Sequence, residues 1–254
     1  MKTLFLIAVN TFRETIRNQV LYNILLFAIV IIVLSVSFGD WSVFARVQVM
    51  QDFGLATMSV SGLLLAVFIG VGLLGREVAS KTVYGLATKP VRRWNILLGK
   101  FSGLMGTLML NFFIMTLCFI GAIVLIGGET GGQILLAVLL IWIEMALIVA
   151  VSLFFSTFTS PSLAAILTFG FYIAGHFNNL TDTQFVHSEM SLYWIVLNVI
   201  YFLMPNLEHL NIRADVIYGN GVTPGFVLYA GVYGILYTIL FLFLSSVTFS
   251  RKDL

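Results

Sequence analysis

The chain has few charged residues and a single cysteine, and these two scarcities exclude most classes of soluble protein. Of its 254 residues only 9% are charged, whereas 60% are hydrophobic and the mean hydropathy is +1.05. An ordinary soluble domain has about 25% charged residues, because polar side chains must cover its surface. One cysteine forms neither an internal disulfide nor a thiolate metal site. We therefore expect a protein whose exterior faces lipid.

The sequence also has no phosphate-binding loop of the form G-x-x-x-x-G-K-[ST], which excludes ATP hydrolysis by the P-loop route in this chain. The stretch 70–75 fits G-x-G-x-x-G, but it closes an apolar run instead of following a strand. Its small residues therefore predict close helix contact and not dinucleotide binding. Gly99 and Gly103, spaced as G-x-x-x-G, predict a second close contact of this kind.

Six segments are apolar and about long enough to cross a bilayer core of about 30 Å as helices. A seventh run, 192–204, is shorter and is closed by Pro205, so we expect a re-entrant or interfacial helix there, before the sixth span. The fold class is all-α, a polytopic membrane protein with a single transmembrane domain over residues 1–254. The predicted spans are 20–38, 55–74, 101–126, 134–155, 158–177 and 226–249.

Basic residues are concentrated on one side of this topology. Six spans place both termini and the loop 76–100 together, and that side holds every Lys and Arg except Arg46 and Arg213. Positive residues favour the cytoplasmic side, so both termini are expected in the cytoplasm. A seventh crossing would move Arg251 and Lys252 to the outside.

Residues 1–19 have the pattern of an amphipathic helix on the membrane surface. Their charged side chains cluster away from the apolar ones, which is typical of an interfacial helix ahead of a span. The alternative is a simple cytoplasmic extension of the first span. The apolar face consists of Leu4, Ala8, Phe12 and Ile16, and the charged group of Arg13, Glu14 and Arg17.

The cytoplasmic loop between the second and third spans predicts a docking surface. Residues 77–86 favour a short helix that ends near Gly85 and Pro90 and presents Tyr84 with apolar neighbours in a basic surround. An exposed apolar tip of this kind suits contact with a protein partner. The alternative is a solvated basic loop held near anionic lipid. That alternative explains the charges but does not explain Tyr84 and its apolar neighbours.

Short stretches of the sequence, taken together and in order, resemble those of a known family. They are NTFRE at 10–14 with Arg17, EVASKTVY at 77–84 followed by KP at 89–90 and GK at 99–100, FS at 155–156 with SP at 160–161, PNL at 205–207, and FSRKDL at 249–254. With six spans, this order resembles an ABC-2-type permease, the membrane subunit of an ATP-binding-cassette transporter.

The resemblance implies a function and a set of partners. It makes residues 77–86 a coupling helix that docks on a separate ATPase, and the N-terminal helix a connecting helix near the same ATPase. It also implies two ATPase copies that bind ATP and Mg, a second copy of this or a related permease, and a bacterial or archaeal cytoplasmic membrane. The implied interface residues are Arg13, Glu14, Arg17, Glu77, Thr82, Tyr84, Lys89 and Arg93.

Glu144 is an acidic residue deep in a predicted span, about 15 Å into the core. Such a residue is protonated, paired, or turned towards a polar interior, so it has either a structural or a transport role. A transport role defines the main alternative function, a standalone secondary transporter or channel. A further alternative is a membrane anchor for a partner complex.

The histidines and the outer segment of the chain give two further expectations. His176, His187 and His209 lie at or beyond the outer span ends, where we expect lone interfacial histidines and no metal site. The outer segment 178–224 is a lid over a pathway, a docking surface for an extracytoplasmic partner, or a re-entrant hairpin packed on the spans.

With so small a net charge, +2, we expect no nucleic acid as a partner, and this chain is expected to bind no cofactor.

Overall fold

The computed structural model describes residues 2–40, 45–79, 93–128, 131–177 and 204–250, and every regular element within these ranges is helical. In chain order the elements are α1 (Lys2–Ile16), α2 (Gln19–Asp40), α3 (Arg46–Ala79), α5 (Arg93–Leu125), α6 (Gly132–Phe158), α7 (Pro161–Phe177), the 3₁₀ turn η2 (Leu207–Leu210), α9 (Arg213–Tyr218) and α10 (Pro224–Ser250).

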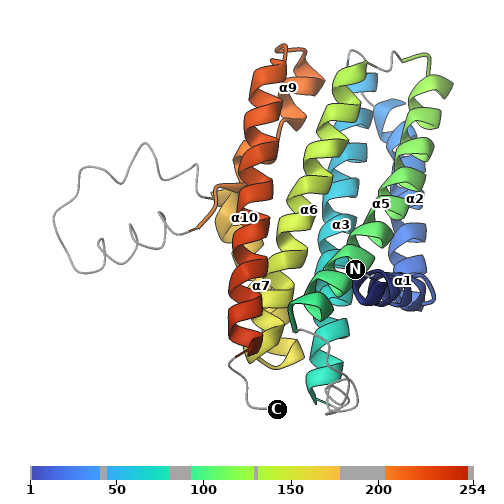
Figure 1. The fold of residues 1–254 in the computed structure, drawn as a ribbon. Helices are drawn as coiled ribbons and strands as arrows, with labels where there is room; N and C mark the ends of the chain where they lie inside the picture. The colour runs from blue at the N-terminus through green and yellow to red at the C-terminus, as the bar shows by residue number, and fades with distance from the viewer. Residues whose placement is uncertain (1, 41–44, 80–92, 129–130, 178–203, 251–254) are drawn as a thin grey trace.

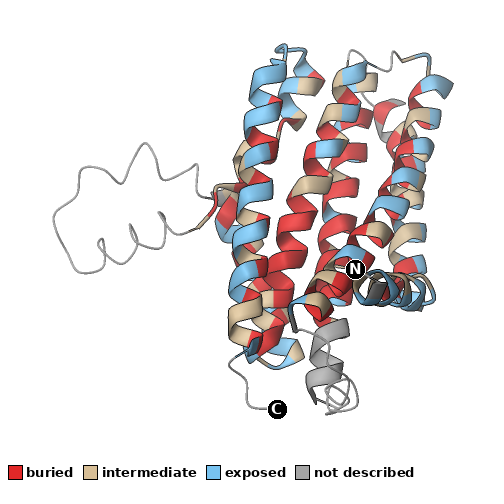
Figure 2. Cartoon of the chain, in the orientation of Figure 1, coloured by how far each residue is buried: buried red, intermediate tan, exposed pale blue. Residues whose placement is uncertain are grey.

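The long helices form one bundle, in which α3 and α6 are central. Figure 1 shows α2, α3, α5, α6 and α10 running side by side, with α1 lying across the bundle axis. Within their apolar stretches, 78% of α3 and 61% of α6 are buried, against 22% of α2 and 28% of α10. Figure 2 shows the same concentration of buried residues on the two central helices. The outer helices therefore present apolar side chains outwards, as a lipid environment requires.

Each of the six predicted spans falls on a helix, but the six helices are not equivalent. In the described part of the chain, five of them are long and apolar enough to cross a membrane. The helix at the fifth predicted span, α7, has 17 residues, so it rises only about 25 Å. Figure 1 shows that α7 starts at the end of the bundle where α10 finishes and stops short of the opposite end. Six crossings therefore remain a prediction.

Small residues let the central helices approach closely. A Cβ at Gly62 on α3 would lie 2.8 Å from Phe112 Cζ on α5 and 2.9 Å from Met145 Cγ on α6. A Cβ at Gly70 would meet the Ser152 side chain of α6. The interpretation of the 70–75 glycines as helix-packing residues is therefore confirmed for Gly70.

Several hydroxyl groups inside the bundle are satisfied within their own helices. Ser152 Oγ donates to the Val149 carbonyl at 2.8 Å, and Thr168 Oγ1 donates to the Ala164 carbonyl at 2.7 Å. Such bonds let a polar side chain sit in an apolar interior without a partner on the next helix. The contacts between α3, α5 and α6 therefore depend mainly on shape and close packing, with one hydrogen bond from Ser61 Oγ to Met115 Sδ at 3.5 Å.

Candidate functional site

The N-terminal helix α1 is separate from the first span. It ends at Ile16, and α2 begins at Gln19 after a corner at Arg17 and Asn18. The Asn18 side chain stabilises this corner, because its Oδ1 accepts a hydrogen bond from the Val20 backbone N–H at 3.0 Å. The alternative in which residues 1–19 simply extend the first span is therefore wrong.

Close backbone contact fixes α1 against the start of α5. A Cβ at Gly99 would lie 2.7 Å from Ile7 Cγ2, and a Cβ at Gly103 would lie 2.6 Å from the Ala8 carbonyl oxygen. Neither position has room for a side chain, so the two helices touch through their backbones. The close contact predicted from the G-x-x-x-G spacing is confirmed, and its partner is α1.

The most buried side chains of α1 are not those of its predicted apolar face. The buried side chains are Thr11 and Thr15, which are 4% and 1% exposed, while Leu4, Ala8, Phe12 and Ile16 are only partly buried. The Thr15 hydroxyl donates to the Thr11 carbonyl at 2.8 Å, which satisfies it in an apolar contact. Threonines suit this face because they are small enough to pack against the glycines of α5.

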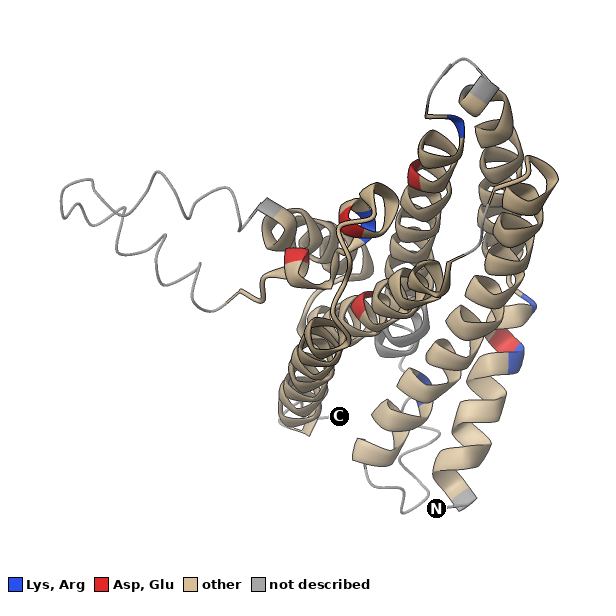
Figure 3. Ribbon diagram, turned by 90° about the horizontal axis from the view of Figure 1, so that it is seen from above, with Lys and Arg blue, Asp and Glu red and all other residues tan. Residues whose placement is uncertain are grey.

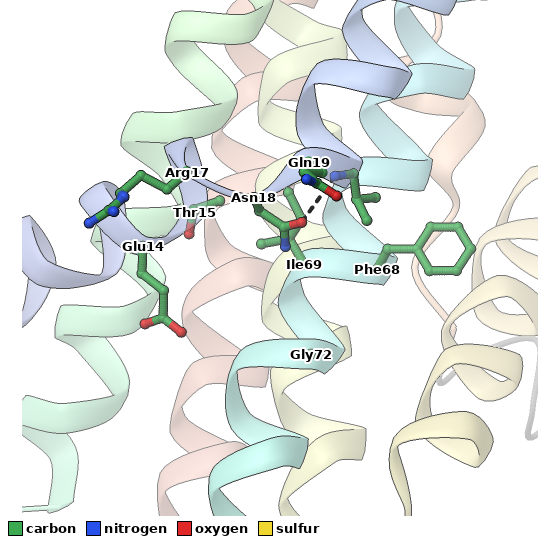
Figure 4. Close-up of a pocket in the computed structure, with 9 residues that line it drawn as sticks. Glu14, Thr15, Arg17, Asn18, Gln19, Phe68, Ile69 and Gly72 are labelled. Atoms are coloured by element: carbon green, nitrogen blue, oxygen red, sulfur yellow. Dashed lines mark hydrogen bonds between the residues drawn. The ribbon is translucent and has the colours of Figure 1, made fainter.

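The three N-terminal residues predicted to face an ATPase are exposed. Arg13 and Glu14 are exposed on α1 and Arg17 is exposed at the corner just after it, and Figure 3 shows a charged group at the edge of a bundle with few other charged residues. Glu14 and Arg17 also line a pocket of about 360 Å³ at the corner between α1 and α2, shown in Figure 4. The position of these residues suits contact with a partner.

The other predicted interface residues lie at or beyond the ends of α3 and α5. Thr82, Tyr84 and Lys89 fall outside the described residues, whereas Glu77 is in the last turn of α3 and Arg93 is the first residue of α5. The predicted short helix does not start at Glu77, because α3 continues without a break to Ala79. No glycine or proline occurs at 76–79 to end the helix earlier.

Glu144 is buried in α6 and faces a histidine. Its side chain is 2% exposed, and its Oε1 lies 3.4 Å from His176 Nε2 on α7. His176 Nδ1 lies 3.2 Å from the Tyr172 carbonyl, and the Tyr172 hydroxyl lies 3.1 Å from Ser59 Oγ on α3. These four residues, called here the Glu144 cluster, join α3, α6 and α7.

The expectation that His176 is a lone interfacial histidine is therefore wrong. The reason is the shortness of α7, which ends inside the bundle and so brings His176 to the depth of Glu144. Tyr172 and His176 are four residues apart and share one helical face, with ring centroids 4.4 Å apart. This i, i+4 pair of polar-tipped aromatic residues in an apolar helix was the available sequence signal. No group of three metal-ligating side chains occurs in the described part of the chain.

The described part of the outer segment packs on the bundle. Leu207 and Leu210 are fully buried, and a Cβ at Gly175 would lie 2.6 Å from Leu207 Cγ. The Asn206 backbone N–H donates to the Tyr233 hydroxyl at 2.8 Å. Residues 205–210 thus pack against α7, and α9 packs on α3 and α6. The predicted helix at 192–204 lies outside the described residues except for its last position.

The fold and these sites define a multi-pass helical membrane protein. A family model described as ABC-2 family transporter protein matches residues 5–254. The chain therefore belongs to the ABC-2 transporter family and is an ABC-2-type permease, a membrane transport subunit. The family implies a partner ATPase. A search of curated proteins finds no match.

The contact between α1 and α5 predicts that Gly103→Val is destabilising. The new side chain must displace the α1 backbone, and overpacking of this kind costs about 1–3 kcal/mol. Gly121→Val is the matched control, because Gly121 is on the same helix and its Cβ would meet nothing within 4 Å. Both variants are purified in detergent and heated, and size-exclusion chromatography monitors the loss of the folded protein. The measured quantity is the midpoint temperature of unfolding of each variant. Equal midpoints for the two variants would contradict the close contact.

The Glu144 cluster predicts a stabilising role for the acid and its histidine. Glu144→Ala leaves His176 Nε2 buried without its partner, so we expect a loss of about 1–3 kcal/mol in unfolding free energy. Glu144→Gln keeps a polar atom near His176 and loses less. A double-mutant cycle with His176→Ala measures the coupling, and strictly additive effects of the two alanine variants would exclude the contact.

Proposed function

We propose that this chain is the permease half of an ABC exporter, which converts movements of a separate ATPase into movements of its own helices. The observation that supports this most directly is the backbone contact of α1 with the start of α5. Arg93, an implied interface residue that follows the predicted coupling helix 77–86, is the first residue of α5; residues 77–93 are called here the coupling segment. Both candidate ATPase contacts, α1 and residues 77–93, therefore connect to one helix.

This connection suggests how movement passes into the bundle. An ATPase that holds both α1 and the coupling segment displaces the first turns of α5 and the last turns of α3. Because α3 packs closely on α6 at Gly70 and Ser152, that displacement changes the central contact. Rigid-body movement of this kind opens and closes a path only if the ATPase binds the two arrangements with different affinities.

The proposed topology has six crossings with both termini in the cytoplasm. In support, Figure 1 places α1, the last turn of α10 and the facing ends of α3 and α5 towards the same end of the bundle. In the sequence, most Lys and Arg residues belong to this end. A bacterial or archaeal cytoplasmic membrane fits this charge distribution and the family.

The proposed assembly has two permease copies and two ATPase subunits, with ATP and Mg bound by the ATPases. Several outward-facing apolar side chains on α2 and α10 are available to lipid or to a second permease. Leu26 and Phe27 on α2 are 66% and 57% exposed, and Leu228 on α10 is 71% exposed. Which of these surfaces meets the second copy is open to mapping by cross-linking.

The alternative of a standalone transporter requires Glu144 to face a transport path. Instead, Glu144 is 2% exposed and faces His176, which supports a structural role in joining α6 to α7. The geometry therefore favours the permease that depends on an ATPase over the standalone transporter.

Loss of the docking surface should release the ATPase. We expect Tyr84→Ala, or Glu77→Ala, to reduce the amount of ATPase that copurifies with the tagged chain by about tenfold, because a few central side chains dominate protein interfaces. Membrane insertion should be unchanged. The control is Tyr218→Ala, at a tyrosine that is 70% exposed on α9, at the opposite end of the bundle.

The measurement is affinity purification from cells that express the permease with its ATPase, with both bands quantified. Unchanged ATPase recovery in both the Tyr84→Ala and the Glu77→Ala variants would contradict the assigned interface. Equal loss in the Tyr218→Ala control would show a general effect on the complex and would contradict it as well.

A further inference from the structure

The pocket at the corner between α1 and α2 has one polar and one apolar wall. Its volume is about 360 Å³, within the range of small-ligand sites. Figure 4 shows Glu14 on α1, Asn18 and Gln19 at the corner, and Phe68 on α3. The polar wall contains Glu14, Arg17, Asn18 and Gln19, and the apolar wall contains Val20 and Phe68.

The orientation and surface of α1 place this pocket at the depth of lipid headgroups. The helix lies across the bundle axis and exposes both apolar and charged side chains, which is the arrangement of a helix at the boundary between headgroups and acyl chains. Phe5 and Leu6 are 68% and 65% exposed, while Arg13 on the same helix is also exposed. A ligand in the pocket therefore borders on the membrane.

The apolar wall continues onto a surface that faces lipid. Val20 is 39% exposed and Phe68 is 53% exposed, so part of each side chain faces outwards. A molecule with its polar end among Glu14 and Arg17 could extend an alkyl chain along these residues. This geometry suits an amphiphile better than a fully polar solute.

The polar wall offers one negative group, one positive group and two amides. Within the described part of the chain, no salt bridge joins Glu14 to Arg17, and Figure 4 shows their side chains pointing in different directions. Asn18 uses its Oδ1 on the Val20 backbone N–H, which leaves its amide N–H groups as donors. The wall therefore matches a ligand in which an anion and a cation are separated by a few bonds.

We propose that this pocket binds the headgroup of a phosphatidylethanolamine-type lipid in the leaflet where α1 lies. The lipid phosphate accepts hydrogen bonds from Arg17 and the Asn18 amide, and the ammonium donates to the Glu14 carboxylate and the Gln19 amide oxygen. Phosphatidylcholine has no N–H group for Glu14, and phosphatidylglycerol has no cation for it. The site thus discriminates by headgroup, and the bound lipid ties the corner between α1 and α2 to the membrane.

The test compares lipids in vesicles that contain the full chain. The protein is reconstituted in phosphatidylcholine with equal shares of phosphatidylethanolamine and phosphatidylglycerol and re-extracted, and its retained lipids are counted by native mass spectrometry. We expect phosphatidylethanolamine to be enriched about fivefold over the other two lipids. A preference of this size corresponds to the free energy that an exposed charge pair contributes. Glu14→Gln and Arg17→Gln should abolish the enrichment. Arg13→Gln, an exposed change on the same helix outside the pocket, should keep it, and Arg17→Lys should keep part of it.

Four outcomes would overturn the proposal. The first is equal retention of the three lipids by the unchanged protein. The second is undiminished enrichment in both glutamine variants while they elute as the unchanged protein does. The third is displacement of the lipid by an equimolar amount of soluble glycerophosphoethanolamine, which would show that the acyl chains add nothing and would identify a water-soluble ligand of the same chemistry. The fourth is that the Glu14→Gln and Arg17→Gln variants lose a copurifying ATPase but retain the lipid as the unchanged protein does. That result would make the pocket a contact with a protein.

Discussion

Close helix packing at glycine positions is the constraint on which the rest of the structure depends. In lipid, little free energy is gained when an apolar side chain moves from the acyl chains into a contact between helices. Helices therefore associate mainly where their backbones can approach each other. On α3, Gly62 and Gly70 admit side chains of α5 and α6, and on α5, Gly99 and Gly103 admit the backbone of α1. The central bundle and the transverse N-terminal helix therefore form one packed body, and a force applied to α1 reaches the spans.

The buried polar groups of the bundle differ in whether they link one helix to another. The hydroxyls of Ser152 and Thr168 are satisfied within their own helices, so they leave the contacts between helices free of specific polar bonds. The Glu144 cluster differs, because it links α3, α6 and α7 through side chains. Such a link ties the short α7 to α3 and α6. The movement that we propose for transport is a shift at the contact between α3 and α6.

The sequence predicted the features that depend on local composition. Apolar length placed each predicted span on a helix, although α3 and α5 begin nine and eight residues before the predicted positions 55 and 101. The spacing of Gly99 and Gly103 predicted a close contact, although not its partner. The expectation for His176 failed because depth was counted from the ends of a full-length span, whereas α7 stops inside the bundle. The burial of Thr11 and Thr15 on α1 was not predicted, because it depends on packing against the start of α5. The interface residues Thr82, Tyr84 and Lys89 remain predictions.

The central claim is that the exposed charges of α1 and the coupling segment lie on the side of the membrane where an ATPase acts. Cysteine labelling tests it most directly, after replacement of the natural Cys118 by serine and with single cysteines at positions 14, 84 and 220. With a membrane-impermeant reagent on intact cells, the account predicts labelling at position 220 alone, with positions 14 and 84 labelled only after the membrane is opened. Labelling of positions 14 and 84 in intact cells would contradict it.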